Sequence, residues 1–304
     1  MTGEQTLQAA PGVDPALHRA RIEEANRRMR RSGWRRHLPQ RGHLVLLPLS
    51  IIMVLPFVWM TLTSFMTDTE IQRIPPAIWP HHLNMGGYKL VLGSSDFPYW
   101  FLNSLIVSGA AVIAQLILCS LAGYAFARIQ FRGSTVMLIL LLATALIPFQ
   151  LTVIPTFVIF HDIGLINTLG ALIVPQLTSA LGIYLMYSFF QSFPRELEEA
   201  GRIDGCSRLQ VFWKIVLPLA RPALAALGII TFIYAWNDLF WPLIVLNSDN
   251  PTVQVAIDNL NAGYVPDMSV ILAGTLLGTL PVLAVFILLG RQIVGGIMQG
   301  AIKG

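Results

Sequence analysis

The chain has 304 residues, of which 55% are hydrophobic and only 12% are charged, and its mean hydropathy is +0.65. This composition excludes an ordinary soluble domain, in which about 25% of the residues are charged. The formal net charge is +4, but no basic stretch alternates with aromatic residues as in a single-strand binder, so no nucleic-acid partner is expected.

Residues 1–43 are polar and rich in arginine, and they precede an apolar run that is too long for the core of a signal peptide. We therefore expect a retained cytoplasmic tail. Two interpretations of the tail stay open. Residues 15–37 could form a basic helix on anionic lipid, or the tail could be disordered and serve only to fix the orientation of the chain.

Six apolar runs are long enough to cross a bilayer about 30 Å thick, which takes about 20 residues. They lie at 44–65, 101–127, 135–160, 167–191, 220–246 and 268–290. The sequence therefore predicts an all-α polytopic membrane protein with six transmembrane helices.

The distribution of positive residues predicts the orientation of these helices. Lys and Arg are concentrated before the first run, between the second and third, between the fourth and fifth, and after the sixth. The alternate segments 66–100, 161–166 and 247–267 contain only Arg73 and Lys89. Since positive residues stay on the cytoplasmic side, both termini are predicted to be cytoplasmic.

The longest predicted external segment, 66–100, contains several prolines, which favour a structured extended loop. Its aromatic residues are typical of anchors at the membrane surface, and contact with an external binding protein is the alternative. These residues are Trp79, Tyr88, Phe97, Tyr99 and Trp100.

A charged segment, 193–222, separates the fourth and fifth apolar runs. Ser192 is predicted to cap a short helix, and Gly205 to form a tight turn with positive φ. A second helix is then predicted to carry an apolar stripe along the protein or membrane surface, and prolines end it. The stripe consists of Leu209, Phe212, Trp213 and Val216.

This segment resembles the cytoplasmic coupling loop of ABC importer permeases. The resemblance rests on Glu199-Ala200-Gly201, Asp204-Gly205-Cys206, Phe212, Ile215, Leu217-Pro218 and Pro222. The chain departs from the family pattern at Gly201 and Cys206, where Ala or another small residue is usual.

Further segments are similar to the smaller, maltose-type permease subunit of bacterial carbohydrate importers. They are Phe101-Leu102-Asn103-Ser104, the run 121–128, Ile147-Pro148 with Gln150, Trp236-Asn237-Asp238-Leu239-Phe240-Trp241-Pro242-Leu243, and the ending 291–304. The resemblance implies a type I importer fold in the bacterial inner (plasma) membrane. It divides the chain into the tail 1–43, a first helix 44–65, the external loop 66–100, a core 101–293 with coupling loop 193–222, and a cytoplasmic tail 294–304.

The resemblance also implies the partners: a second permease subunit, two cytoplasmic ATPase subunits, an extracytoplasmic sugar-binding protein and membrane lipid. Glu199 is expected to form the main ion pair with the ATPase, while Asp204 and Gly205 hold the turn. The small residues Ala200 and Gly201 are expected to let the partner's backbone approach closely. The alternative is that these carboxylates only solvate an exposed loop.

The chain contains no glycine-rich phosphate loop followed by Lys and Ser or Thr. We therefore expect no enzyme activity, no catalytic residue, no metal and no bound cofactor in this subunit. ATP and Mg²⁺ are expected to be used by the partner ATPase.

Polar residues within the apolar runs are candidates for a translocation path, because such residues usually face the bundle interior or water. The candidates are Gln150, Trp236, Asn237 and Asp238. Aromatic rings beside hydrogen-bonding groups suit a sugar, and hydrogen bonding to neighbouring helices is the alternative.

Three other functions stay open at this point. A permease for a polyol, sugar phosphate or other small solute would share the coupling loop. A secondary transporter could use Asp238 as its ion site, and a membrane scaffold could use the loop without moving a solute.

Overall fold

The computed structural model describes residues 41–75, 77–93, 96–129, 131–247, 250–261 and 267–301, and only the backbone for 41–45, 261 and 291–301. Residues 1–40, the bulk of the predicted tail, therefore lie outside the described residues. The chain divides into two units, Met1–Trp59 and Met60–Gly304. The described part of the first unit is a single helix that continues into the second.

Within the described ranges the regular structure is helical. The helices are α2 (Arg41–Thr63), α3 (Asp68–Ile71), α4 (Gly86–Gly93), α5 (Phe97–Arg128), α6 (Ser134–Thr144), α7 (Phe149–Asp162), α8 (Leu169–Ile173), the 3₁₀ turn η1 (Val174–Gln176), α9 (Ala180–Ser192), α10 (Arg195–Ile203), α11 (Arg208–Val211), the π-helix η2 (Phe212–Val216), α12 (Leu217–Leu219), α13 (Arg221–Trp236), α14 (Phe240–Val245), α15 (Val253–Asn261) and α16 (Met268–Ala301).

Four helical segments are long and apolar enough to cross a membrane: Leu46–Thr63, Phe97–Arg128, Leu169–Ser192 and Met268–Gly290. Two further spans are obtained if each of two bent pairs counts as one. The α6–α7 pair bends by 93°, and the pair formed by Arg208–Leu219 and Arg221–Trp236 bends by 77°. The described residues therefore contain four to six candidate spans.

The sequence predicts one continuous transmembrane helix in each of the apolar runs 135–160 and 220–246. In the structure both runs are broken. In the first run, α7 begins directly after Pro148, which lacks an amide hydrogen and disfavours helical geometry in the residue before it. In the second run, Asn237, Asp238 and Leu239 separate α13 from α14. The second break coincides with the polar residues Asn237 and Asp238, which the sequence analysis took as part of a continuous span.

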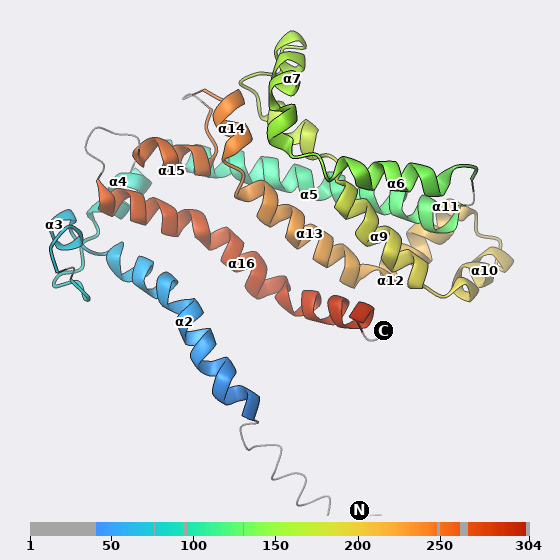
Figure 1. The fold of residues 1–304 in the computed structure, drawn as a ribbon, viewed down its shortest axis with the longest axis horizontal. Helices are drawn as coiled ribbons and strands as arrows, with labels where there is room; N and C mark the ends of the chain where they lie inside the picture. The colour runs from blue at the N-terminus through green and yellow to red at the C-terminus, as the bar shows by residue number, and fades with distance from the viewer. Residues whose placement is uncertain are drawn as a thin grey trace, which may run out of the picture. The chain divides into compact units, whose positions relative to one another are not determined.

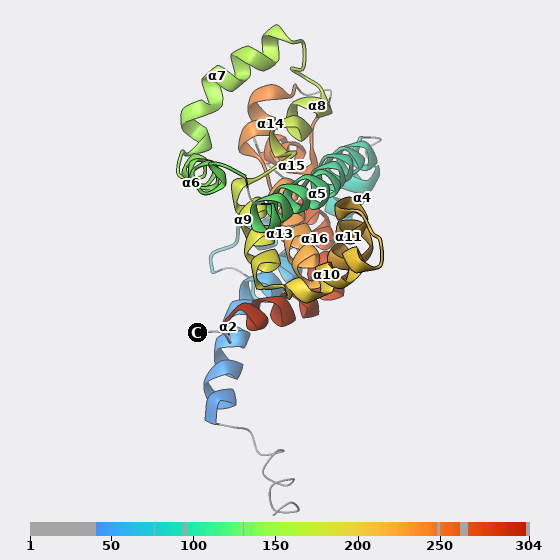
Figure 2. The same cartoon turned by 90° about the vertical axis from the view of Figure 1, so that its right-hand side faces the viewer.

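Helix α5 forms the centre of the second unit and packs against α9 and α13 (Figures 1 and 2). Its buried face carries small residues, and a Cβ added to Gly123 would lie 2.7 Å from Cβ of Met186 on α9. Small residues let membrane helices approach closely in this way. Helix α13 also packs against α16, which in turn contacts α4 and α15.

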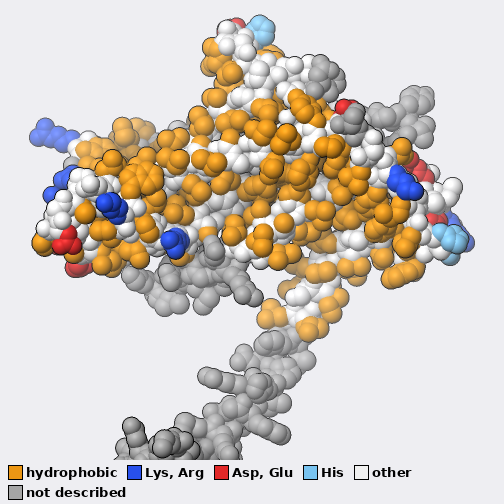
Figure 3. Space-filling view, turned by 180° about the vertical axis from the view of Figure 1, so that it is seen from behind, with side chains coloured by type: hydrophobic (Ala, Val, Ile, Leu, Met, Phe, Trp, Pro, Cys, Tyr) orange, Lys and Arg blue, Asp and Glu red, His pale blue; other side chains and the backbone are white. Residues whose placement is uncertain are grey.

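Three buried apolar clusters stabilise the second unit. One includes Phe190, Phe212 and Val216 and supports the segment from α10 to α12. The others are centred on Trp241 and on Ala273. On the face seen in Figure 3, hydrophobic side chains cover the middle, and charged ones gather toward the two ends. This distribution matches a bilayer-facing band between two polar surfaces.

Candidate functional site

The sequence analysis predicted the wrong N-cap residue for helix α10. Ser192 is the last residue of α9, and its hydroxyl donates to the carbonyl of Phe189 at 2.8 Å. The N-cap of α10 is Pro194, which has extended backbone and no side-chain cap bond. The cap prediction was wrong because Ser192 still belongs to α9, which ends one residue beyond the predicted apolar run 167–191.

The turn after α10 is confirmed at Gly205, whose φ is +86°. The amide of Gly205 donates to the carbonyl of Arg202, and the amide of Cys206 to that of Gly201 at 3.0 Å. These bonds satisfy the last carbonyls of α10. Ser207 then starts α11 with a capping box, in which its backbone amide donates to Oε1 of Gln210 at 2.8 Å.

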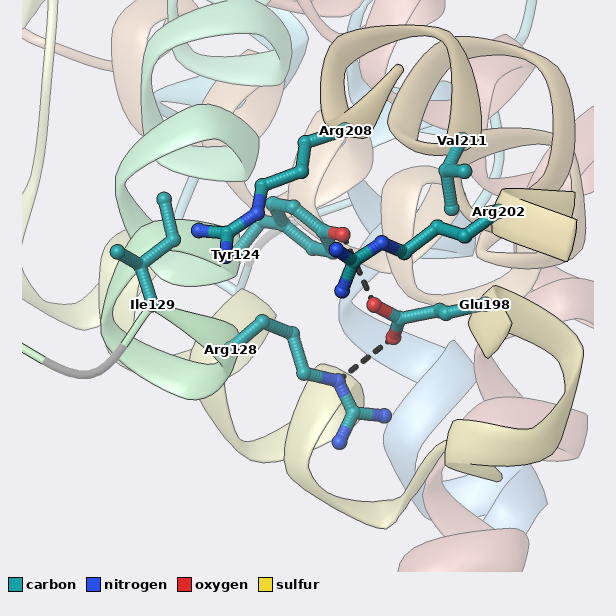
Figure 4. Close-up of a pocket in the computed structure, with 7 residues that line it drawn as sticks. All are labelled: Tyr124, Arg128, Ile129, Glu198, Arg202, Arg208 and Val211. Carbon is teal, nitrogen blue, oxygen red and sulfur yellow. Dashed lines mark hydrogen bonds and ion pairs between the residues drawn. The ribbon is translucent and has the colours of Figure 1, made fainter. Parts of the chain in front are cut away.

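Glu198 joins α10 to the end of α5 (Figure 4). One carboxylate oxygen lies 2.7 Å from Nε of Arg128, and the hydroxyl of Tyr124 donates to the other at 2.9 Å. The side chains of Arg128 and Glu198 are only 8% and 14% exposed. Arg128 also donates to the carbonyl of Phe193. A partly buried ion pair with these additional hydrogen bonds fixes one helix end to the other.

A cavity of about 90 Å³ opens beside this ion pair. Three arginines and one glutamate line it, so its charged residues sum to two positive charges. The lining residues are Tyr124, Arg128, Ile129, Glu198, Arg202, Arg208 and Val211. In Figure 4 all three guanidinium groups lie around Glu198 and Tyr124.

Gly201 is buried against its own chain and is not open to a partner's backbone, contrary to the expectation from its small size. A Cβ at this position would lie 2.4 Å from Cδ1 of Ile215 and 3.4 Å from Cγ2 of Val211. The small residue therefore lets α10 pack closely on α11 and η2. The neighbouring Ala200, in contrast, is exposed.

The predicted apolar stripe is only half correct. Phe212 and Val216 are buried, but Leu209 and Trp213 are 61% and 44% exposed. The buried positions are instead Val211, Phe212 and Val216. The helix widens into a π-helix at Phe212, which changes the angular spacing on which a 3.6-residue pattern depends.

The outer side of α10 is available for contact. Glu199, Ala200 and Asp204 are exposed, and the apolar side chain of Ile203 is 86% exposed beside the turn. An exposed Ile next to a rigid glycine turn, with carboxylates around it, has the character of a docking surface. We call the exposed residues Glu199, Ala200, Ile203 and Asp204 the outer face of α10.

The structure does not bring the translocation-path candidates together. Trp236 is 1% exposed, and its indole N–H donates to the carbonyl of Gly278 on α16 at 2.8 Å. Asn237 donates to the carbonyl of Ile233 in its own helix at 2.9 Å. Gln150 is exposed in the first turn of α7. Trp236 is thus a packing residue, which corrects its expected role beside a sugar.

Asp238 lies close to a polar side chain from another helical segment. Its carboxylate faces Nε2 of Gln176 at 3.5 Å, in the break between α13 and α14. The carbonyl of Gln176 accepts a hydrogen bond from Gln115 on α5 at 3.0 Å, and Gln115 accepts one from Thr231 on α13 at 3.0 Å. We call Gln115, Gln176, Thr231 and Asp238 the central polar cluster.

Sequence reasoning missed the Glu198–Arg128 pair and the exposed Ile203. One signal was present: Tyr124 and Arg128 are four residues apart, so they share a face at the end of an apolar span. Four carboxylates lie in or beside α10: Glu196, Glu198, Glu199 and Asp204. The orientation of α10 decides which of them reaches that face, and the local sequence does not predict this orientation.

Comparisons with known proteins identify the family of the chain. Residues 116–295 match the family described as binding-protein-dependent transport system inner membrane component. The chain is 31% identical, over 84% of its length and 93% of the relative, to the arabinooligosaccharides transport system permease protein AraQ of Halalkalibacterium halodurans. It is 32% identical, over 88% of its length and 98% of the relative, to the lactose transport system permease protein LacG of Rhizobium radiobacter.

A solved structure has the same fold. It is a chain from a bacterial ABC transporter involved in the import of the acidic polysaccharide alginate, and the TM-score is 0.74. The match covers 84% of this chain and 99% of that chain at 22% sequence identity.

Proposed function

Because the chain belongs to the family of binding-protein-dependent transport system inner membrane components, we propose that it is the permease subunit of an ATP-driven importer for a sugar or oligosaccharide. It forms half of the path across the membrane, and a second permease subunit forms the other half. Two separate ATPase subunits bind on the cytoplasmic side, and a binding protein delivers the solute on the other. In this assembly six helical segments cross the membrane, and both termini are cytoplasmic.

The single observation that carries the proposal is the two-sided character of α10. Its inner side is fixed to the end of α5 by the Glu198–Arg128 pair and to η2 by the close contact of Gly201 with Ile215. Its outer face presents exposed carboxylates and Ile203. A helix that is tied firmly to a membrane core and exposed on its other side is suited to pass a partner's motion inward.

In the proposed mechanism these contacts pass motion from the ATPase to the membrane core. ATP binding closes the two ATPase subunits, and each carries the helix seated on it through a small rotation. Because Glu198 ties α10 to Arg128 at the end of α5, that rotation moves the central helix, on which α9 and α13 also pack. The core then favours a different opening of the path, and hydrolysis reverses the shift.

The substrate class is supported by the relatives, whose names specify arabinooligosaccharides and lactose. Within this chain the central polar cluster is the candidate path lining, since Asp238 lies in a helix break beside the Gln176 side chain. Polar groups in a break between membrane helices are positioned to meet a solute.

The test is uptake of labelled saccharides by proteoliposomes that contain the complete complex and enclose ATP. The proposal expects uptake that needs both ATP and the binding protein and that persists when the proton gradient is collapsed. Uptake that continues without ATP and stops with an ionophore would instead assign the chain to secondary transport.

A further inference from the structure

Residues 65–75 and 77–84 are the described part of a loop whose two ends are joined by a hydrogen bond at its base. The amide of Asn84 donates to the carbonyl of Phe65 at 2.8 Å, which joins the two ends. Inside the loop, the carboxylate of Glu70 accepts hydrogen bonds from the amide of Thr67 at 2.9 Å and from the amide of His81 at 3.1 Å. These bonds hold the two arms of the loop in one arrangement.

One candidate membrane span, α16, adjoins this base. The carboxylate of Asp68 accepts a hydrogen bond at 2.9 Å from the amide of Ser269, in the first turn of α16. Figure 1 shows α3, α4 and the start of α16 at one end of the second unit, opposite α10 and α11. The base therefore lies beside the start of a candidate membrane span.

The tip of the loop exposes three large apolar side chains. Ile74, Ile78 and Trp79 are 94%, 75% and 67% exposed, and Leu83 next to the base is 76% exposed. A group of exposed apolar side chains on a braced loop marks a contact surface, because leaving such area in water has a cost in free energy. Charged and polar residues such as Arg73, His81 and His82 lie among them in the sequence.

We propose that this tip inserts into the headgroup region of the bilayer, on the side opposite α10. The base is held at the membrane surface, so the apolar tip begins at the depth where lipid is available. Trp is the residue most typical of this depth, and aliphatic side chains beside basic and polar ones are typical of segments that lie in the interface. The contact would anchor the end of α2 and the start of α16 to the outer lipid layer.

The experiment places a fluorescent probe on one cysteine in the complete complex, reconstituted in nanodiscs. The background replaces Cys119 and Cys206, and any partner cysteines, by alanine. One variant carries the probe at Ile78→Cys, in the tip, and the matched control carries it at Thr69→Cys, an exposed polar position on α3 of the same loop. Each is titrated with nitroxide-labelled phospholipid and with a water-soluble quencher, with and without the binding protein.

The proposal expects nitroxide lipid to quench the probe at position 78 at least twofold more than the probe at position 69. The water-soluble quencher should show the reverse order, and the binding protein should change neither. Equal access of both probes to the water-soluble quencher would overturn the proposal. Shielding of position 78 only after the binding protein is added would also overturn it and assign the tip to that protein.

Discussion

The carboxylate of Glu198 lies 2.7 Å from Nε of Arg128, so the last residue of α5 is ion-paired with the first half of α10. This pair connects the most central helix of the second unit to the segment that the family resemblance assigns to ATPase contact. The neighbouring Glu199 points outward and is exposed. Two adjacent glutamates therefore have different expected roles, and variants can separate them.

Replacing Glu198 by Gln removes the charge that pairs with the buried Arg128. Breaking one side of a buried ion pair costs about 3 kcal/mol. We expect the complex to bind its ATPase subunits but to take up several-fold less saccharide per ATP hydrolysed. Uptake and hydrolysis measured in the same proteoliposomes check this.

The matched control is Glu196→Gln, which changes an exposed carboxylate on the same helix. It should leave the ratio of uptake to hydrolysis at the wild-type value. If Glu198→Gln and Glu196→Gln behave alike, the ion pair does not transmit motion. Partial recovery in Glu198→Arg combined with Arg128→Glu would support the pairing further.

Replacing Glu199 by Lys reverses a charge on the outer face of α10. If Glu199 pairs with a basic group of the ATPase, this change turns attraction into repulsion, and the dissociation constant should rise at least tenfold, or about 1.4 kcal/mol. The measurement is the amount of ATPase that co-purifies with the assembled permease at increasing salt. Unchanged retention would contradict the assignment of Glu199.

Replacing Gly205 by Val forces a β-branched residue into a turn whose φ is +86°. Left-handed geometry costs a side-chain-bearing residue about 1–2 kcal/mol, and more when it is β-branched. Gly133→Val is a matched control, since Gly133 has φ +82° and, like Gly205, has no atom within 4 Å of the added Cβ. Both variants should lose stability in a thermal assay, but only Gly205→Val should weaken ATPase association.

Replacing Asp238 by Asn removes the formal charge from the central polar cluster and keeps its size. If Asp238 lines the path, saccharide uptake should fall several-fold while the binding protein's own affinity for the saccharide stays the same. Uptake assays and calorimetry on the isolated binding protein give the two numbers. An unchanged uptake rate would assign Asp238 to packing against Gln176.

The loop at 65–84 should loosen in acid. A hydrogen bond from the Thr67 backbone, with further ones from the Thr67 hydroxyl and the His81 backbone, holds the pKa of the Glu70 carboxyl below its ordinary value of 4.5. A lowered pKa means that this carboxylate stabilises the loop above pH 4.5 and that the effect is lost as the pH falls through the folded-state pKa.

Hydrogen exchange of the peptide 65–84, corrected for the intrinsic pH dependence of exchange, should therefore show less protection below pH 4.5. Glu70→Gln should show reduced protection already at pH 7 and little further change in acid. Equal protection in both proteins at pH 7 would show that Glu70 does not brace the loop.

Much of the helical fold could be predicted from the sequence, because apolar length and charge asymmetry depend on local composition. The candidate spans within α2, α5 and α16, and the positive φ of Gly205, follow from such local rules. The break at Pro148 was missed because the residues on both sides of it are apolar, and the break at Asn237 to Leu239 was missed because its polar residues were assigned to the translocation path within a continuous span.

The contacts of the candidate site were harder to predict, because they join segments far apart in the chain. Arg128 and Glu198 are 70 positions apart in the numbering, and only the packing of α10 on η2 through Gly201 decides which glutamate turns inward. Family resemblance directed attention to Glu199, whose side chain is exposed. It carried no information on the adjacent Glu198, which the structure pairs with Arg128.

The most direct test of the account is photo-crosslinking from Ile203, the most exposed apolar residue of α10. A photoreactive amino acid at position 203 in the complete complex should capture the ATPase subunit, and the same group at Leu83, at the other end of the second unit, should not. Capture from position 203 that strengthens when ATP is trapped would support transmission through α10. The central claim is contradicted if position 203 yields no ATPase adduct in a complex that still transports saccharide.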